Sequence, residues 1–300
     1  MKLILGYACL NTTIPLKMKT LRLATYLAKG DEYLKGLVLD NLAYVKACLE
    51  WNLDHQVVFF RVSSDLVPLA THPQMTFRWW QDPEVSARCE DIRQLAVTHQ
   101  MRLTMHPGQY TLLNSPRKDV VERSLEDLDY HRLVAEKLGV TDLITHVGGL
   151  YGDRESAIQR WIHQYQALPA GIQQRLRLEN DEKLFAISDV LAISHKTGVP
   201  AVLDFHHHRI LPSMDLPEAV REAAQTWQGT GNPKFHLSSG KSSPLDRRHD
   251  DWIHESDFRH VVELLATALG KSNAPVYLML EAKLKEQALL RLQPMLSSQR

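Results

Sequence analysis

Six short apolar runs of this chain each end on a side chain that can bind a metal ion. The six terminal residues are His106, His146, Glu179, Asp204, His236 and Glu281. The runs are nearly continuous in apolar residues, as expected for parallel strands whose two faces are both covered. Two earlier runs, residues 3–8 and 57–62, share this character. The sequence therefore predicts eight strands, six of which place a metal-binding side chain at the same end.

Stretches with the apolar spacing of a helix follow these runs. They cover residues 36–51, 84–99, 117–138, 154–168, 182–196, 216–227, 257–269 and 285–292. This alternation predicts a single-domain (β/α)8 TIM barrel over residues 1–293, with a short C-terminal tail over residues 294–300. An open doubly wound sheet is less consistent with six strand-end ligand residues, because ligands of such a sheet bind at one switch point. Only a closed barrel directs all six strand ends to one mouth.

Five long segments follow strand ends and are expected to be functional loops: residues 10–35, 63–81, 107–116, 205–214 and 237–256. The 35 basic and 35 acidic residues exclude a uniformly cationic nucleic-acid wrapper but allow local basic loops. Three cysteines without CxxC spacing favour a reducing cytoplasm. No apolar run approaches the length of about 20 residues that a membrane span needs, so no membrane contact is expected.

The strand-end residues predict a metal site. Carboxylates and imidazoles gathered in one mouth are costly unless cations neutralise them. In the run His206-His207-His208, alternate side chains of an extended segment face opposite ways, and His207 is expected to point inward. His249 lies in a loop, and its position alone leaves ligation open. Helical positions favour structural roles for His99, His131, His163, His195 and His260.

The number and type of these ligands indicate a cluster of ions. A single catalytic zinc ion uses about three protein ligands, so seven or eight predict two or three ions with shared carboxylates. Imidazole and carboxylate without thiolate suit zinc, manganese or iron. Clustered ions are typical of phosphate-ester hydrolysis, which makes phosphodiester cleavage the expected chemistry.

The predicted mouth also carries groups suited to DNA. Gln109 and Tyr110 follow the ligand His106 closely, and we interpret them as a wedge that inserts between bases and stacks on them. Basic and aromatic residues alternate on the same loops: Lys17, Lys19, Arg22, Lys29, Arg61, Phe77, Arg78, Trp79, Trp80, Arg117, Lys118, Lys241, Arg247 and Arg248. This combination favours contacts to phosphates together with base stacking.

An ordered set of motifs makes the chain resemble the UV damage endonucleases of the endonuclease IV-like metal-dependent barrel superfamily. The motifs are LGYACLN (5–11), FRVSSDLVPLATHP (60–73), MHPGQY (105–110), THVGG (145–149), LENDE (178–182), LDFHHH (203–208), KFHLSSG (234–240), HDDWI (249–253) and LEAKLKE (280–286). The resemblance implies a nick immediately 5′ to cyclobutane dimers and 6-4 photoproducts in double-stranded DNA, leaving a 3′-hydroxyl and a 5′-phosphate. Abasic sites are a further candidate substrate, and excision would start without ATP.

The resemblance also implies residue roles. The implied ligands of up to three metal ions are His106, His146, Glu179, Asp204, His207, His236, His249 and Glu281. Manganese is the family's usual ion, with zinc or magnesium as alternatives, and Glu179 and Asp204 would bridge ions. Glu179, His236 and Lys234 are implied in catalysis, and Lys234 resembles a metal-adjacent lysine that can be carboxylated.

The resemblance assigns DNA contacts as well. Gln109 and Tyr110 would probe the duplex opposite the lesion, while Tyr7 and Asn11 would lie near the flipped damaged bases. His72 matches a lesion-binding motif. A monomer is expected.

Two other functions remain open from the sequence. A sugar isomerase or epimerase on a related barrel would use one or two metal ions in a narrow, closed pocket. A non-catalytic lesion sensor would bind distorted DNA and recruit other proteins. Seven or more ligands and basic loops argue against the first, and an intact ligand set argues against the second.

Overall fold

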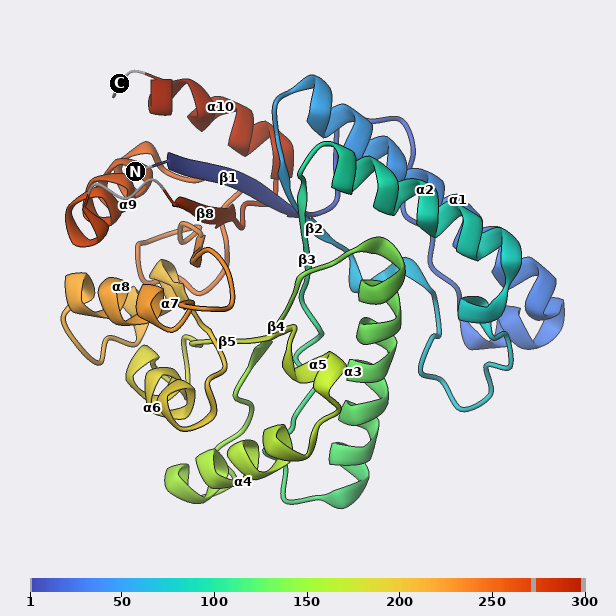
Figure 1. Cartoon of the computed structure of the whole chain (residues 1–300), viewed down its shortest axis with the longest axis horizontal. Coiled ribbons are helices and arrows are strands. Elements are labelled where there is room, and N and C mark those ends of the chain that lie inside the picture. The colour runs from blue at the N-terminus through green and yellow to red at the C-terminus, as the bar shows by residue number, and fades with distance from the viewer. Residues whose placement is uncertain (1, 271–273, 298–300) are drawn as a thin grey trace.

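Eight parallel strands close into a barrel in the computed structural model, which describes residues 2–270 and 274–297. The strands are β1 (Lys2–Cys9), β2 (Phe59–Val62), β3 (Arg102–Met105), β4 (Asp142–His146), β5 (Leu176–Glu179), β6 (Ala201–Asp204), β7 (Lys234–Leu237) and β8 (Pro275–Leu280). They pair in chain order, and β1 pairs in parallel with β8. The predicted single-domain TIM barrel is confirmed, and Figure 1 shows the helices arranged around it.

The helices alternate with the strands, and additional short helices or 3₁₀ turns lie in the β2–α2, α4–β5 and β6–α8 connections. They are α1 (Leu23–Asp54), α2 (Pro83–Thr98), α3 (Lys118–Leu138), α4 (Arg154–Ala167), α5 (Ala170–Gln173), α6 (Ile187–Thr197), α7 (Phe205–Ile210), α8 (Leu216–Gln225), α9 (Glu255–Leu269) and α10 (Lys285–Ser297), with 3₁₀ turns η1 (Ser64–Leu66) and η2 (Trp79–Gln81). None of the helices in the described residues is long and apolar enough for a membrane span.

Local sequence signals explain several helix boundaries. The Asp82 carboxylate accepts hydrogen bonds from the backbone amides of Glu84 and Val85, and Pro83 occupies the first turn of α2. Helix α3 ends at Gly139, whose φ of 76° favours a residue without a side chain. These signals place the start of α2 and the end of α3 within one residue of the predicted boundaries.

Three helix boundaries differ from the sequence predictions. Helix α1 begins at Leu23, inside the predicted loop 10–35, because good helix formers flank a single break at Gly30 (φ 75°). Helix α6 starts five residues later than predicted, because the Asp181 carboxylate accepts hydrogen bonds from the amides of residues 183–185 and holds them in a turn. Helix α10 continues past residue 293 to Ser297, so the predicted tail begins within it.

A fourth difference concerns the three consecutive histidines. Residues 205–210 form the short helix α7 rather than an extended segment, and the Asp204 carboxylate accepts a hydrogen bond from the amide of His207 at its start. All three histidine side chains are buried, including His206 and His208.

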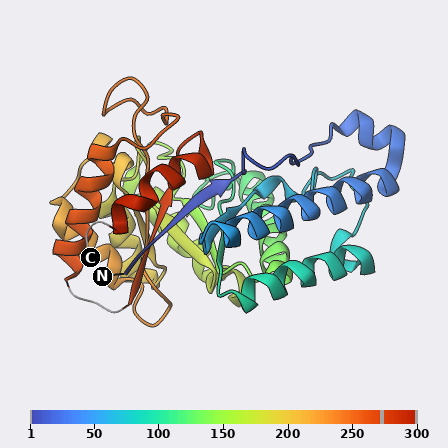
Figure 2. The ribbon, with the colours of Figure 1, turned by 90° about the horizontal axis from the view of Figure 1, so that it is seen from above.

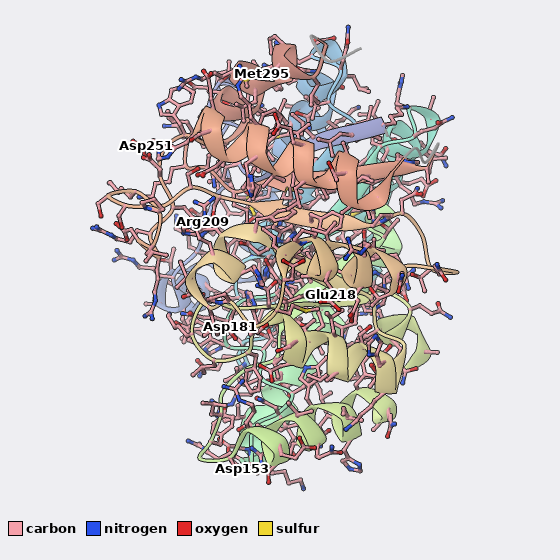
Figure 3. The ribbon with its side chains drawn as sticks, turned by 90° about the vertical axis from the view of Figure 1, so that its left-hand side faces the viewer. Asp153, Asp181, Arg209, Glu218, Asp251 and Met295 are labelled. Atoms are coloured by element: carbon pink, nitrogen blue, oxygen red, sulfur yellow. The ribbon has the colours of Figure 1, made fainter. Side chains whose placement is uncertain are left out.

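The strand ends face one side of the barrel. Asp153, Asp181, Arg209 and Asp251 belong to the segments that follow β4, β5, β6 and β7, and Figure 3 shows them along the same edge of the molecule. Helices α1 and α2 extend away from the barrel side by side (Figure 2). The strand-end side chains are therefore carried by the closed barrel. The loops that follow the strands differ in length.

Candidate metal centre

The carboxylate of Glu179, at the end of β5, lies in the middle of the strand-end residues and is almost completely buried. Its Oε2 lies 2.9 Å from Nε2 of His106 and 3.6 Å from Nε2 of His146. Its Oε1 lies 2.6 Å from Nδ1 of His236. One side chain therefore contacts residues from β4, β7 and the end of β3.

Three groups of side chains, all containing Glu179, bring potential ligand atoms within 4.8 Å of one another. They are His106 with His146 and Glu179, then Glu179 with Asp204 and His207, and finally Glu179 with His236 and Glu281. The structure thus brings together seven of the eight predicted ligands. The shared position of Glu179 is the arrangement expected of a carboxylate that bridges neighbouring ions, whereas Asp204 belongs to one group.

Asn180, which follows Glu179 directly, holds the backbone of Asp204 and the ring of His207 in the group of Glu179, Asp204 and His207. The Asn180 side chain accepts a hydrogen bond from the backbone amide of Asp204 and donates one to its carbonyl. The Asn180 carbonyl oxygen lies 2.9 Å from Nδ1 of His207. Such partners orient ligands and select the ring nitrogen that is free to bind an ion.

The donor set fits divalent ions. Oδ2 of Asp204 is buried and has no hydrogen-bond partner within the described residues. Burial alone would lower the pKa of His207, but the Asp204 and Glu179 carboxylates raise it to about 9. Negative potential at this point therefore stabilises a positive charge, which is what a cation site requires.

The pKa of Glu179 also fits a cation site. Burial alone would raise its pKa, but the neighbouring His236 and His146 and the hydrogen bonds from His106 and His236 hold that pKa well below its usual value. The carboxylate is consequently ionised at neutral pH, as a metal ligand must be.

The predicted ligand His249 lies beside these groups rather than within one. Its Nδ1 is 3.9 Å from Oε2 of Glu281, and its ring centre is 6.4 Å from that of His207. Glu182 also reaches this region, with a carboxylate oxygen 3.8 Å from Nε2 of His207. The sequence pattern assigned Glu182 to a helix and did not identify it.

Lys234 is completely buried inside the barrel, two residues before His236 on β7. Its Nζ has no hydrogen-bond partner within the described residues and lies 5.6 Å from the ring centre of Phe59. Burial, together with the charges of Arg61 and Arg102, holds its pKa well below its usual value against the opposing effect of Asp142. The shift favours the neutral form of this amine, which lies two residues before the predicted ligand His236.

The loop after β3 presents Tyr110 to solvent. This side chain is 80% exposed, whereas the residues that follow it are anchored on α3. The amide of Leu112 donates a hydrogen bond to Ser124, and the Thr111 hydroxyl donates one to Asp127. Gln109 is exposed beside Tyr110. An exposed ring on an anchored loop is suited to insertion between bases.

Tyr7 and Asn11 are buried rather than exposed at the mouth. The Tyr7 hydroxyl donates a hydrogen bond to Asn52 and accepts one from the Asn11 side chain. The Asn11 side chain also accepts hydrogen bonds from the amides of Thr13 and Ile14. These hydrogen bonds stabilise the β1–α1 loop. Because both side chains are buried, they could contact a flipped base only if this loop opens.

His72 lies away from the three ligand groups. It borders a groove of about 630 Å³ on the outside of the barrel, between the β2–α2 segment and α3, together with Trp80, Tyr130 and Leu133. Its Nδ1 accepts a hydrogen bond from the amide of Gln74.

Arg61 on β2 is a site residue that the strand-end pattern did not assign to the metal centre. Its guanidinium donates a hydrogen bond to Glu281 and lies 3.2 Å from Nε2 of His236. Only 6% of its side chain is exposed. The available signal was a charged residue inside an otherwise apolar run, which is costly unless it is paired.

Comparisons with known proteins agree with this geometry. The family model described as UV-endonuclease UvdE matches residues 3–300. A UV DNA damage endonuclease of Bacillus pumilus is 37% identical over 280 residues, which cover 90% of this chain and 84% of that protein. The crystal structure of SacUVDE superimposes with a TM-score of 0.90 at 33% identity, covering 99% of this chain and 98% of that chain.

A more distant solved structure shares the fold. Endonuclease IV from Thermus thermophilus superimposes with a TM-score of 0.59 at 14% identity and covers 98% of each chain. The family match over nearly the whole chain decides against the sugar isomerase and the non-catalytic sensor. This chain belongs to the UV-endonuclease UvdE family and is an endonuclease of that family.

Proposed function

We propose that this endonuclease is a metal-dependent DNA repair enzyme that nicks double-stranded DNA immediately 5′ to ultraviolet photoproducts. The proposed substrates are cyclobutane dimers and 6-4 photoproducts, with abasic sites as a further substrate, and the proposed products carry a 3′-hydroxyl and a 5′-phosphate. The observation that carries the proposal is the position of Glu179 in all three ligand groups. The names of the relatives supply the lesion class.

The protein's own residues prepare this site for an anionic substrate. Glu179, Asp204 and Glu281 would hold the ions together with the histidines, and Asp204 is proposed as a second bridge. When bound, clustered divalent ions stabilise the negative charge that develops on a phosphodiester during hydrolysis. Asn180 and Arg61 keep Asp204, His207 and Glu281 in place through the contacts described above.

Lys234 and His236 are proposed to act next to the reacting phosphate. Carboxylation requires a neutral amine, whose nitrogen attacks carbon dioxide and releases a proton, and the lowered pKa of Lys234 favours that form. The carbamate would be an anion near Arg61 and Arg102, whose charges already lower the lysine pKa. A carbamate carbon resonance in protein equilibrated with ¹³C-bicarbonate, absent from Lys234→Met, tests this assignment.

Recognition of the lesion is proposed to depend on Gln109 and Tyr110, which would enter the duplex opposite the damage. Exposure of 80% of the Tyr110 side chain supports this role. Tyr7, Asn11 and His72 remain proposed lesion contacts, the first two after an opening of the β1–α1 loop. Manganese is the proposed ion, with zinc or magnesium as alternatives, and the protein is proposed to act as a cytoplasmic monomer.

Nicking of supercoiled plasmid tests the function directly. Irradiated and untreated plasmids are incubated with the protein as purified, after treatment with EDTA, and after addition of manganese to the treated protein. We expect nicking of irradiated plasmid only, its loss in EDTA and its recovery with manganese. Equal nicking of both plasmids, or none with any divalent ion, would contradict the proposal.

A further inference from the structure

A cationic pocket lies beside the candidate metal centre, where the end of β1 meets the segment that follows β8. Its volume is about 410 Å³, and its walls come from the ends of β1, β2 and β8 and from the β7–α9 loop. Four cationic side chains line it, Arg61, Arg248, Lys283 and Lys285, against a single carboxylate, Glu281. The excess of positive charge favours an anionic ligand.

The innermost cation of this pocket, Arg61, is nine-tenths buried and incompletely paired. Its guanidinium contacts Glu281, but its Nε is buried and has no hydrogen-bond partner within the described residues. A buried donor without a partner costs free energy unless a ligand or water satisfies it. Arg61 therefore provides an independent indication that this pocket accepts a hydrogen-bonding ligand.

The two loops that carry the outer cations are tied together. The amides of Lys283 and Leu284 donate hydrogen bonds to the carbonyl oxygens of Asp250 and Asp251. Arg248 pairs with Asp246 at 2.7 Å. Neither Lys283 nor Lys285 forms an ion pair through its side chain in the part of the chain that the structure describes, so both charges remain available to a ligand. The pocket is thus largely formed before a ligand arrives.

From these observations we infer that the pocket binds the non-bridging oxygens of a DNA backbone phosphate that flanks the scissile one. This inference rests on the proposed function. The pocket shares Glu281 and His249 with the predicted ligand set, so its ligand and the phosphate at the metal centre are neighbours along one strand. Arg61 contacts both regions and sets the spacing between the two phosphates. The pocket therefore fixes which linkage of the strand reaches the ligand groups.

Single-turnover nicking of a synthetic duplex with one photoproduct tests the inference. The metal-loaded wild-type protein is compared with Lys285→Met, which keeps the length of the side chain and removes its charge. We expect a roughly tenfold higher half-saturating protein concentration, a salt slope lowered by about one, and an unchanged maximal rate. Lys196→Met serves as the matched control, because Lys196 is exposed in the last turn of α6, between β5 and β6, and does not line the pocket.

Uncharged methylphosphonate linkages show which DNA phosphate binds in the pocket. Duplexes carry one methylphosphonate at each position around the nick, and each is tested with wild-type protein and Lys285→Met. We expect the difference between the two proteins to disappear when one flanking phosphate is neutralised. A difference that persists at every position, or disappears only at the scissile phosphate, overturns the inference. Arg248→Gln provides a second variant if Lys285→Met folds poorly.

Failure of the proposed function gives a different result. In that case the wild-type protein does not nick the damaged duplex in preference to an undamaged one. The salt dependence of binding to undamaged duplex, measured by fluorescence anisotropy, still reports whether Lys285 contacts a phosphate. An unchanged salt slope in Lys285→Met then overturns the pocket assignment independently of the lesion.

Discussion

Nδ1 of His236 lies 2.6 Å from Oε1 of Glu179, although 57 residues separate them in the chain. The contact joins β7 to β5, and the other oxygen of the same carboxylate faces His106 at the end of β3. Glu179 is therefore the residue whose loss would disturb all three ligand groups together.

Replacement of Glu179 by Gln should abolish cleavage while most DNA affinity remains, because the basic loops are untouched. We expect nicking of irradiated plasmid to fall by at least about 100-fold, above the effect of losing a residue that only orients a ligand. Gel assays for nicking and fluorescence anisotropy for binding measure the two effects. Glu263→Gln, at an exposed position of α9, is the control. Retained nicking would contradict the shared role of Glu179.

Metal should stabilise the fold of the wild-type protein. An ion that binds only the folded state at 100 times its Kd adds about 2.7 kcal/mol, so manganese should raise the unfolding midpoint of EDTA-treated protein. Glu179→Gln should show a much smaller rise. Thermal unfolding followed by circular dichroism measures this without any substrate. Equal rises in both proteins would place the ion elsewhere.

Tyr110→Ala should weaken discrimination between damaged and intact duplex. Stacking on an aromatic ring contributes about 1–3 kcal/mol per base, which corresponds to roughly 5- to 150-fold in relative affinity. Fold stability should not change, because the side chain is 80% exposed. Tyr110→Phe retains the ring and should preserve the preference. Loss of metal from the Ala variant with an unchanged lesion preference would refute the wedge assignment.

Asp142→Asn should destabilise the barrel at neutral pH. Asp142 is buried at the start of β4 and pairs with Arg102 at 2.9 Å and with Arg177 at 2.8 Å. Removal of one partner from a buried ion pair costs about 3–5 kcal/mol. Urea unfolding, with the exposed Asp91→Asn as control, measures the change in the free energy of unfolding.

We also expect the stability difference between the wild-type protein and Asp142→Asn to depend on pH. Burial alone would raise the pKa of Asp142, but the two arginines hold it below its ordinary value of 3.8. Because the folded pKa is depressed, the carboxylate stabilises the fold above about pH 4, and this stabilisation is lost as the pH falls through the folded pKa. The difference between wild type and Asp142→Asn should therefore shrink at low pH. A constant difference from pH 7 to pH 3 would contradict this.

The sequence predicted the barrel and most of the metal centre because parallel strands impose one direction on every strand end. His146, Glu179 and Asp204 terminate their strands as expected, and seven predicted ligands converge. This part of the site depends only on local sequence and on closure of the barrel.

Contacts between distant segments could not be predicted from the sequence in this way. Arg61 meets Glu281 from a strand 220 residues earlier, and no local pattern reports that pairing. Helix α7 is six residues long, too short for an apolar period, so its sequence predicts an extended segment instead. The buried hydroxyl of Tyr7 donates a hydrogen bond to Asn52, 45 residues later in the chain, another partner that only the three-dimensional packing reveals.

The pairing of β1 with β8 also determines when nuclease activity can arise during protein synthesis. A growing chain that has reached β5 already carries His106, His146 and Glu179, but β1 has no eighth strand beside it. Glu281 and the lysines that follow it are added only after β8 has been made. Unfinished chains released from the ribosome therefore lack Glu281, one of the predicted ligands, and the cationic pocket, so we expect no cleavage of DNA by incomplete copies of the enzyme.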